Sequence, residues 1–147
     1  MSTSTLLFSF QGRISRQPYW LVTIAMIALT LVLFGIVFFA VGSFPAGGLE
    51  AAIADGTLWL LVLYIPLIWI GLAVATKRLH DRDKSAWWLL LFYGLPGVLD
   101  GAGRAIGDMG TVLSLAGSAI SIWALIDLGF LRGTPGPNRY RPDPLGA

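Results

Sequence analysis

The sequence has no cysteine and few charged residues, and each scarcity excludes a class of protein. Without cysteine there can be no disulfides, thiol nucleophiles or cysteine-ligated metal centres. Asp, Glu, Lys and Arg make up only 12% of the 147 residues, about half their share in an average soluble domain, whereas 56% of the residues are hydrophobic. A water-facing surface cannot be built from so few charges, so the composition predicts an integral membrane protein.

Signatures of common catalytic sites are also missing. The chain contains no phosphate-binding loop, nucleophile elbow or zinc-binding spacing. His80 is the only histidine; to hold a metal with Asp81 and Asp83 it would need further ligands, and the flanking cations oppose one. General acid-base chemistry by His80 is chemically reasonable, because the reference pKa of histidine lies near neutrality. We nevertheless expect no enzyme, no catalytic residues, no cofactor and no metal site.

Long uncharged runs are what the sequence does contain. They predict one membrane domain with spans at about 20–41, 58–76, 86–99 and 110–131, followed by a tail at 132–147. The third run is short: Ala86 to Val98 gives about 20 Å of helix, so it is either a short crossing or a re-entrant hairpin. Pro66 at the centre of the second run predicts a kink, and the glycine-rich stretch from Asp100 to Asp108 predicts a linker.

Basic residues decide the orientation, because short cytoplasmic loops carry an excess of Lys and Arg. With four crossings and the N-terminus inside, only Arg104 lies outside, and the other nine basic residues lie on the cytoplasmic side. If the third run failed to cross, the split would fall to seven against three. The expected fold is therefore an all-α, four-helix transmembrane bundle with both termini in the cytoplasm. Its cytoplasmic cap would contain the amphipathic segment from Leu6 to Ile14, the loop from Lys77 to Ser85 and the proline-rich tail.

Three polar segments share that predicted cytoplasmic side, and we expect them to contact one another. If the second helix continues past Thr76, Lys77 and Asp81 fall at i,i+4 spacing and Arg78 and Asp81 at i,i+3. The alternative is a solvated loop whose cations hold the helix ends at the lipid headgroups. The candidate polar site consists of Arg13, Arg16, Arg78, His80, Asp81, Arg82, Asp83, Asn138, Arg139 and Tyr140.

Asp127 is the only acid within a predicted span. It lies about 9 Å from the span centre, where a lone carboxylate still costs up to roughly 3 kcal/mol. We therefore expect Asp127 to face protein and to pair with arginine, Arg78 first, with Arg132, Arg82 or His80 as the other candidates. The pair would either pin the helices together or serve a proton or ion relay, and pinning is the favoured alternative.

Small residues recur at intervals of three or four along the fourth span, at Gly110, Ser114, Gly117, Ser121 and Ala124. Such a face favours close helix approach, although the same face could line a narrow pore if several copies assembled. Trp69 and Trp123 lie deeper than the headgroup level and are expected to pack rather than to form a ligand cage.

Three stretches together resemble one family of small bacterial membrane proteins. They are FQGRISRQPYW at residues 10–20, KRLHDRDKSAWWLLL at 77–91 and GTPGPNRYRPDP at 133–144. The set is similar to the family known as domain of unknown function 805. The resemblance implies a multi-pass protein of the bacterial inner membrane and brings no established activity, substrate or cofactor.

Two functions remain open from the sequence. The leading hypothesis is a non-catalytic membrane module that binds a protein partner or lipid headgroups at its cytoplasmic face. The alternative is a small oligomeric ion channel or transporter, which would need a water-open stripe of polar side chains between its helices. Membrane lipids and further copies of the chain are the expected partners; nucleic acid is not, because the basic residues sit beside apolar runs rather than on a surface stripe.

Overall fold

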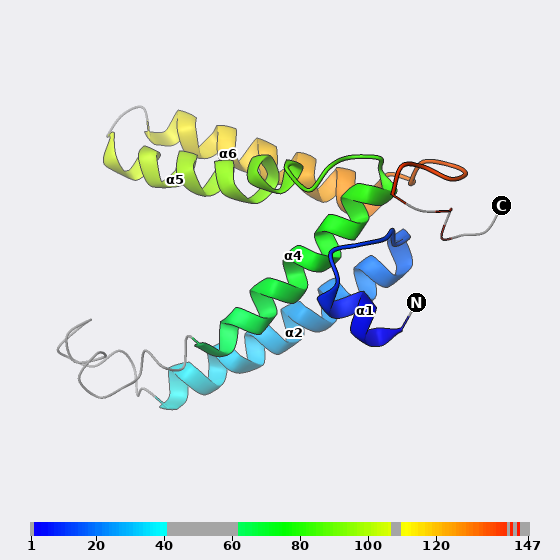
Figure 1. Cartoon of the computed structure of the whole chain (residues 1–147). Helices are drawn as coiled ribbons and strands as arrows, with labels where there is room; N and C mark the ends of the chain where they lie inside the picture. Colours follow the sequence, from blue (N-terminus) through cyan, green and yellow to red (C-terminus); the bar gives the residue numbers. More distant parts are fainter. Residues whose placement is uncertain (1, 41–61, 107–109, 141, 143, 145–147) are drawn as a thin grey trace.

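The computed structural model describes residues 2–40, 62–106, 110–140, 142 and 144, and within them all regular secondary structure is helical (Figure 1). The all-α prediction is therefore confirmed for the described part of the chain. Its elements are the α-helices α1 (Thr3–Phe8), α2 (Arg16–Ala40), α4 (Tyr64–Asp81), α5 (Leu95–Ala105) and α6 (Gly110–Leu125), and the π-helical segments η2 (Leu90–Gly94) and η4 (Ile126–Phe130).

Among the residues that the structure describes, two stretches of helix are long and apolar enough to cross a membrane, Arg16–Ile36 and Gly110–Phe130. Only 6% of the most apolar window of the first is buried inside the protein. Its outward side chains include Leu21, Leu31 and Phe34, each at least 60% exposed. A soluble protein rarely leaves so much contiguous apolar surface uncovered, so this helix has the surface of one that faces lipid.

The long helices form two antiparallel pairs, α2 with α4 and α5 with α6, which diverge from a common junction (Figure 1). Between the pairs, contact among the described residues centres on η4, which touches both α2 and α4. The buried hydrophobic cluster lies at this junction and consists of Ile14, Tyr19, Val74, Leu79, Phe92, Ala124 and Leu128. The start of α2, the end of α4 and the end of η4 therefore lie at one end of the molecule.

The boundaries of α4 differ from the prediction. The helix continues through Asp81, five residues beyond the predicted end of the span. Pro66 lies in the first turn of α4, where its missing N–H leaves no internal hydrogen bond unmade, so the predicted mid-helix kink is wrong for the described residues. Residues 58–61 of the predicted span, and the whole connection before them, lie outside the described part.

The third run also extends further than predicted. η2 and α5 follow one another without interruption from Leu90 to Ala105, about 24 Å of helix, and run beside α6. Residues 100–105 are therefore helical and not part of a linker, so the prediction was wrong for this part of the stretch from Asp100 to Asp108. Pro96 lies at the start of α5, directly after the π-helical segment η2. Packing against α6 compensates for the low helix propensity of the glycines.

Close approach of α5 and α6 confirms the prediction made for the small residues of the fourth span. A Cβ atom at Gly103 would lie 2.7 Å from the carbonyl oxygen of Gly110, and one at Gly117 would lie 3.2 Å from that of Pro96. The Ser114 hydroxyl donates a hydrogen bond to the Asp100 carboxylate across the same contact, at 3.2 Å. Side chains larger than hydrogen at Gly103 would thus force the two backbones apart.

Candidate functional site at the junction of the helix pairs

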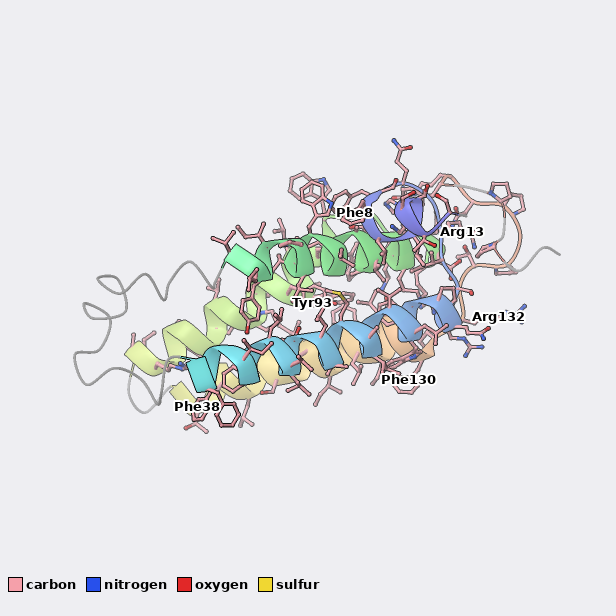
Figure 2. The ribbon with its side chains drawn as sticks, turned by 90° about the horizontal axis from the view of Figure 1, so that it is seen from below. Phe8, Arg13, Phe38, Tyr93, Phe130 and Arg132 are labelled. Carbon is pink, nitrogen blue, oxygen red and sulfur yellow. The ribbon has the colours of Figure 1, made fainter. Side chains whose placement is uncertain are left out.

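Three segments meet at the junction and are called the cap: residues 3–16, 77–85 and 131–140. Arg13 of the first segment pairs with Asp81 of the second. The Asn138 amide of the third donates to the His80 carbonyl at 2.8 Å, and the Tyr140 ring stacks on the His80 ring at 3.8 Å. Figure 2 shows Arg13 and Arg132 at this end and Phe38 at the opposite end. The predicted contact among the three polar segments is therefore confirmed.

Asp81 is the centre of the cap. Its Oδ1 accepts hydrogen bonds from Nε and Nη2 of Arg13, at 3.2 and 3.1 Å, and its Oδ2 accepts one from Nη1 of Arg78. The side chains of both arginines and of Asp81 are at most 4% exposed. The carboxylate also lies so close to Gly133 that there is no room for a Cβ atom at that position. The i,i+3 pair predicted from continuation of the second helix is thus present.

Arg78 joins α4 to the end of η4 and to the N-terminal segment. Its Nε donates to the Leu128 carbonyl at 2.7 Å and its Nη2 to the Leu131 carbonyl at 2.5 Å. Its Nη1 also reaches the Ile14 carbonyl at 3.4 Å. The last carbonyls of a helix have no partner within the helix, so a guanidinium placed there satisfies several acceptors at once.

Lys77 performs the same task for α1. Its Nζ donates to the carbonyls of Thr5, Leu6 and Ser9, at the C-terminal end of α1, where carbonyls lack partners within the helix. The side chain is fully buried, and this burial lowers the pKa of Lys77 to about 8. The i,i+4 partner considered for Lys77, Asp81, is instead occupied by the two arginines.

Asp127 is 2% exposed, which confirms that it faces protein, but its predicted first partner is wrong. Its Oδ1 accepts hydrogen bonds from Lys84 at 2.7 Å and from Arg82 at 3.3 Å, and Arg78 points instead to Asp81 and the η4 carbonyls. Arg82 was among the secondary candidates, whereas Lys84 was missed. Within the described residues, Asp127 Oδ2 and Arg82 Nε are buried without a hydrogen-bond partner.

An aromatic wall holds Lys84 in place. Its Nζ lies 4.3 Å from the Trp88 ring centre, with the rings of Phe92 and Trp123 within 6 Å. Trp88 and Trp123 meet edge to face at 5.7 Å. Trp123 packs against Trp88 and Phe92, as expected. The spacing of Lys84 to Trp88, four residues apart just before a helix, was the signal that could have revealed this cation–π contact.

The remaining candidate residues are more exposed. Arg16 donates to the Phe130 carbonyl at 3.1 Å, and Arg139 pairs with Asp83 at 3.2 Å on the surface. Burial lowers the pKa of His80; the hydrogen bond to the Gly12 carbonyl opposes this lowering, and nearby Arg139 and Lys77 add to it. No three His, Asp or Glu side chains gather as a metal site would require in the part of the chain that the structure describes.

The cap carries a large excess of positive charge. Its described segments and Asp127 together contain three acids, against eight basic residues: Arg13, Arg16, Lys77, Arg78, Arg82, Lys84, Arg132 and Arg139. The buried basic side chains mostly bond to these acids or to backbone carbonyls. The exposed members leave a cationic rim where the apolar helices begin, suited to binding anions.

Comparison with known proteins finds two relatives named as inner membrane proteins and one named as an uncharacterized protein. Inner membrane protein YhaH of Escherichia coli strain K12 is 33% identical over 135 residues, covering 92% of this chain and 86% of the relative. Uncharacterized protein YiiR of the same strain is 35% identical over 155 residues, covering 97% and 90%. Inner membrane protein YhaI is 33% identical over 86 residues, covering 57% and 61%. No solved structure matches the chain.

One family model, described as protein of unknown function (DUF805), matches residues 7–142. The matched region includes Arg13 and Asp81 and reaches through the tail that carries Asn138, so it contains the ion-paired centre of the cap. This match covers most of the chain and agrees with the relatives. The chain therefore belongs to the DUF805 family.

Proposed function

We propose that this protein crosses the bacterial inner membrane four times with its cap in the cytoplasm, and that the cap is a non-catalytic module that binds anionic lipid headgroups. The observation that carries the proposal is the distribution of charge over the fold. Eight of the nine described Lys and Arg residues belong to the cap, and Arg104 lies near the other end of α5. An excess of basic residues on one side of the spans is the mark of the cytoplasmic face.

The arrangement of the helices supports four crossings. α2 begins and α4 ends in the cap, and η4, which continues α6, ends directly before the third cap segment, whereas Ala40, Ala105 and Gly110 lie at helix ends remote from the cap. The two apolar stretches long enough to span lie in different pairs, so each pair contains one. Their partners α4 and α5 run antiparallel beside them. The two relatives named inner membrane proteins supply the choice of membrane.

The contacts of the buried charges favour a structural cap over a catalytic one. Asp81 accepts hydrogen bonds from Arg13 and Arg78, and these two arginines donate to carbonyls of the first and third cap segments and of η4. The alternative channel function drew on the small-residue face of α6, and α5 covers that face at Gly110 and Gly117. The exposed cations Arg16, Arg132 and Arg139 remain to meet the anionic surface of the membrane, where each contributes about 1 kcal/mol.

Reporter fusions test the topology. An alkaline-phosphatase-type reporter, active only outside the cytoplasm, should be silent when fused after residue 145 and active when placed in the connection between α5 and α6. Activity at the C-terminal fusion would overturn the cytoplasmic placement of the cap.

Lipid titration of the purified protein tests the binding function. In a neutral detergent, phosphatidylglycerol should raise the melting temperature more than phosphatidylcholine, and the difference should shrink as salt is added. Replacing Arg16, Arg132 and Arg139 together by glutamine should abolish the difference, while the matched variant Arg104→Gln should retain it. Equal shifts with both lipids would contradict the proposal.

A further inference from the structure

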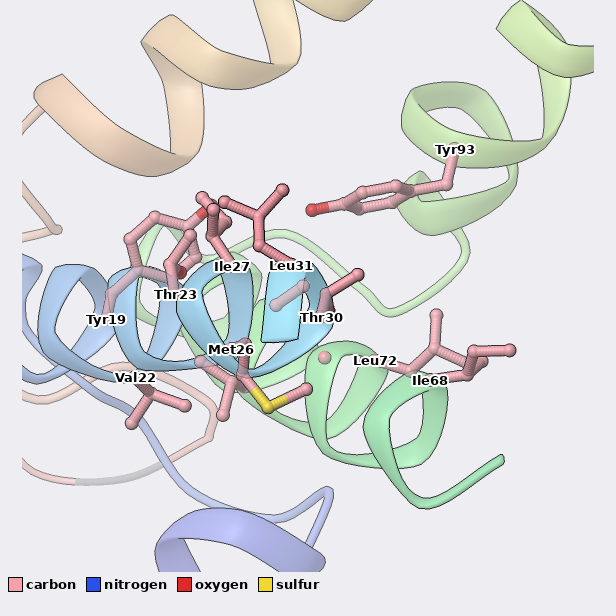
Figure 3. A pocket seen from close by; sticks show the side chains of 13 residues that line it. Tyr19, Val22, Thr23, Met26, Ile27, Thr30, Leu31, Ile68, Leu72 and Tyr93 are labelled. Atoms are coloured by element: carbon pink, nitrogen blue, oxygen red, sulfur yellow. The ribbon is translucent and has the colours of Figure 1, made fainter. Parts of the chain in front are cut away.

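An open groove separates the two helix pairs beside the cap. It has a volume of about 480 Å³ and lies along α2 and α4, with Tyr93 of η2 facing it from the other side (Figure 3). Its wall includes Thr23, Ile27 and Leu31 of α2 and Gly71 of α4, and no charged side chain lines it. The volume falls within the range of small-molecule sites, and the lining suits an apolar occupant.

The length of the groove matches one leaflet of a bilayer. Along α2 its lining runs from Tyr19 to Leu31, which is about 18 Å of helix. Half of the hydrocarbon core is about 15 Å thick. Because Tyr19 lies one turn inside the start of α2, the groove begins at the cap and ends near the middle of the membrane. An acyl chain of the cytoplasmic leaflet has this length and this direction.

A cationic cleft stands at the cap end of the groove. It is lined by Arg16, Arg78 and Arg132 with Asp81 as its only acid, and Asp81 is already paired with Arg13 and Arg78. Along α2, Arg16 precedes the groove residue Tyr19 by one turn. Along α4, Arg78 follows the groove residue Val74 by one turn. The cleft and the groove therefore lie one helical turn apart along both helices.

Two exposed arginines at this cleft have capacity for an anion. The Arg132 guanidinium makes no ion pair or hydrogen bond within the described residues, and Arg16 bonds only to the Phe130 carbonyl. The cleft itself holds about 30 Å³, the room of about one water molecule, so a phosphate group would sit at its mouth between the two guanidinium groups rather than inside it. Arginine is well suited to phosphate, because its planar donors form paired hydrogen bonds.

We propose that one anionic phospholipid of the cytoplasmic leaflet occupies this place, with its phosphate on Arg16 and Arg132 and an acyl chain in the groove between the helix pairs. The inference rests on the proposed function and deepens it, since it turns a general attraction to headgroups into a single defined site. A lipid suits the site better than a helix from a second copy, because the groove combines the length of one leaflet with a phosphate-binding mouth.

Native mass spectrometry of the full chain, released from detergent with added lipid, tests the site. We expect one tightly bound phosphatidylglycerol per chain and weaker binding of phosphatidylcholine. Replacing both Arg16 and Arg132 by glutamine removes charge-assisted hydrogen bonds and should lower the phosphatidylglycerol affinity about tenfold. Inorganic phosphate alone should neither bind detectably nor raise the melting temperature; an equal effect of phosphate would overturn the lipid assignment.

A pair of glycine variants tests the groove. A Cβ atom at Gly71 or at Gly35 would meet nothing within 4 Å, but only Gly71 lines the groove. Gly71→Leu should fill the groove and lower the lipid affinity about tenfold, whereas Gly35→Leu should leave it unchanged. If Gly71→Leu does not give a folded monomer, Thr30→Phe enters the groove from the α2 wall and should have the same effect.

The outcomes separate this inference from the proposed function. If the arginine variants lose phosphatidylglycerol while Gly71→Leu and Thr30→Phe retain it, headgroup binding stands and occupancy of the groove is wrong. If neither set changes binding, both proposals fail. A dimer that carries no lipid and that Gly71→Leu dissociates would make a second copy the occupant and overturn the inference.

Discussion

The molecule holds its helices together in two opposite ways. Between α5 and α6 the contact depends on the absence of side chains, because hydrogen at Gly103 and Gly110 lets one backbone rest on the other. At the cap the contact depends on the longest side chains available, because Arg13, Lys77 and Arg78 reach across to carbonyls of other segments. Glycine contacts can join only neighbouring parallel surfaces, whereas arginine can join a helix end, an extended arm and a tail.

The difference has a physical reason. Inside the hydrocarbon, lipid tails compete with apolar side chains on equal terms, so close packing of small residues is the available attraction. At the edge of the membrane, helix ends and irregular segments expose carbonyls that need donors. Arg and Lys side chains supply those donors, and their charged groups lie beside the few acids present. The two modes should therefore respond to mutation in different ways and by different amounts.

Breaking the cap at Asp81 should have the largest effect. Asp81→Asn removes the carboxylate that pairs with both buried Arg13 and buried Arg78, and loss of one partner from a buried ion pair typically costs about 3–5 kcal/mol. We expect a matching fall in the free energy of unfolding in detergent, measured by denaturant titration. The exposed pair of Asp100 and Arg104 is the control, and Arg104→Gln should cost less than about 1 kcal/mol. Similar losses for both variants would contradict the role of Asp81.

Breaking the glycine contact should have the next largest effect on stability. A second glycine in the same helix, outside the contact, provides a control that should change stability in the opposite direction. Gly103→Ala places a methyl group 2.7 Å from the Gly110 carbonyl oxygen and should destabilise the protein by about 1–3 kcal/mol. Gly101→Ala, two residues earlier in α5, meets nothing within 4 Å and should stabilise it by about 0.5–1 kcal/mol through helix propensity. Melting temperatures that move in the same direction for both variants would show that the close contact does not matter.

These contrasts also explain what sequence alone could predict. The period of small residues was sufficient to predict the α6 contact, since a helix fixes which residues share a face. Charge placement was sufficient to bring the three cap segments together. The glycines at 101 and 103, by contrast, predicted a linker, because their low helix propensity is visible in the sequence while the partner helix that overrides it is not.

The partner of Asp127 could not be predicted for a related reason. Arg78 was predicted first because it lies at the same membrane level as Asp127. The observed pairing, however, depends on two features that no local sequence pattern reveals. α4 continues to Asp81, which offers Arg78 a carboxylate one turn away, and the π-helical segment η4 ends beside Arg78 with open carbonyls. Asp127 is left to Arg82 and Lys84, on the segment that follows α4.

A double-mutant cycle tests the ion pair between Asp127 and Lys84, which we expect to contribute less to stability than the pairs of Asp81. Asp127→Asn and Lys84→Gln should each reduce stability, and together they should lose about 1 kcal/mol less than the sum, because they share one contact. Arg132→Gln is the control and should add to Asp127→Asn without coupling, since Arg132 makes no ion pair within the described residues. Coupling with Arg132 in place of Lys84 would make the observed pairing wrong.

The smallest expected effect is a dependence of stability on pH, which arises from His80 at the contact between the tail and α4. His80 stacks on Tyr140 and bonds to the Gly12 carbonyl, with Arg139 and Lys77 as the neighbouring charges. Its burial lowers its pKa below the ordinary value near 6.5, so between the folded-state pKa and about 6.5 the unfolded chain binds more protons. Stability is therefore complete above about pH 6.5 and falls as the pH drops through that value. Unfolding free energies measured from pH 7.5 to 5 should fall more steeply for the native chain than for His80→Gln, which cannot gain the charge. Because acids such as Asp81 and Asp127 remain in both proteins, the difference between the two curves isolates the contribution of His80. Parallel curves would show that the charge of His80 does not affect how the tail is held.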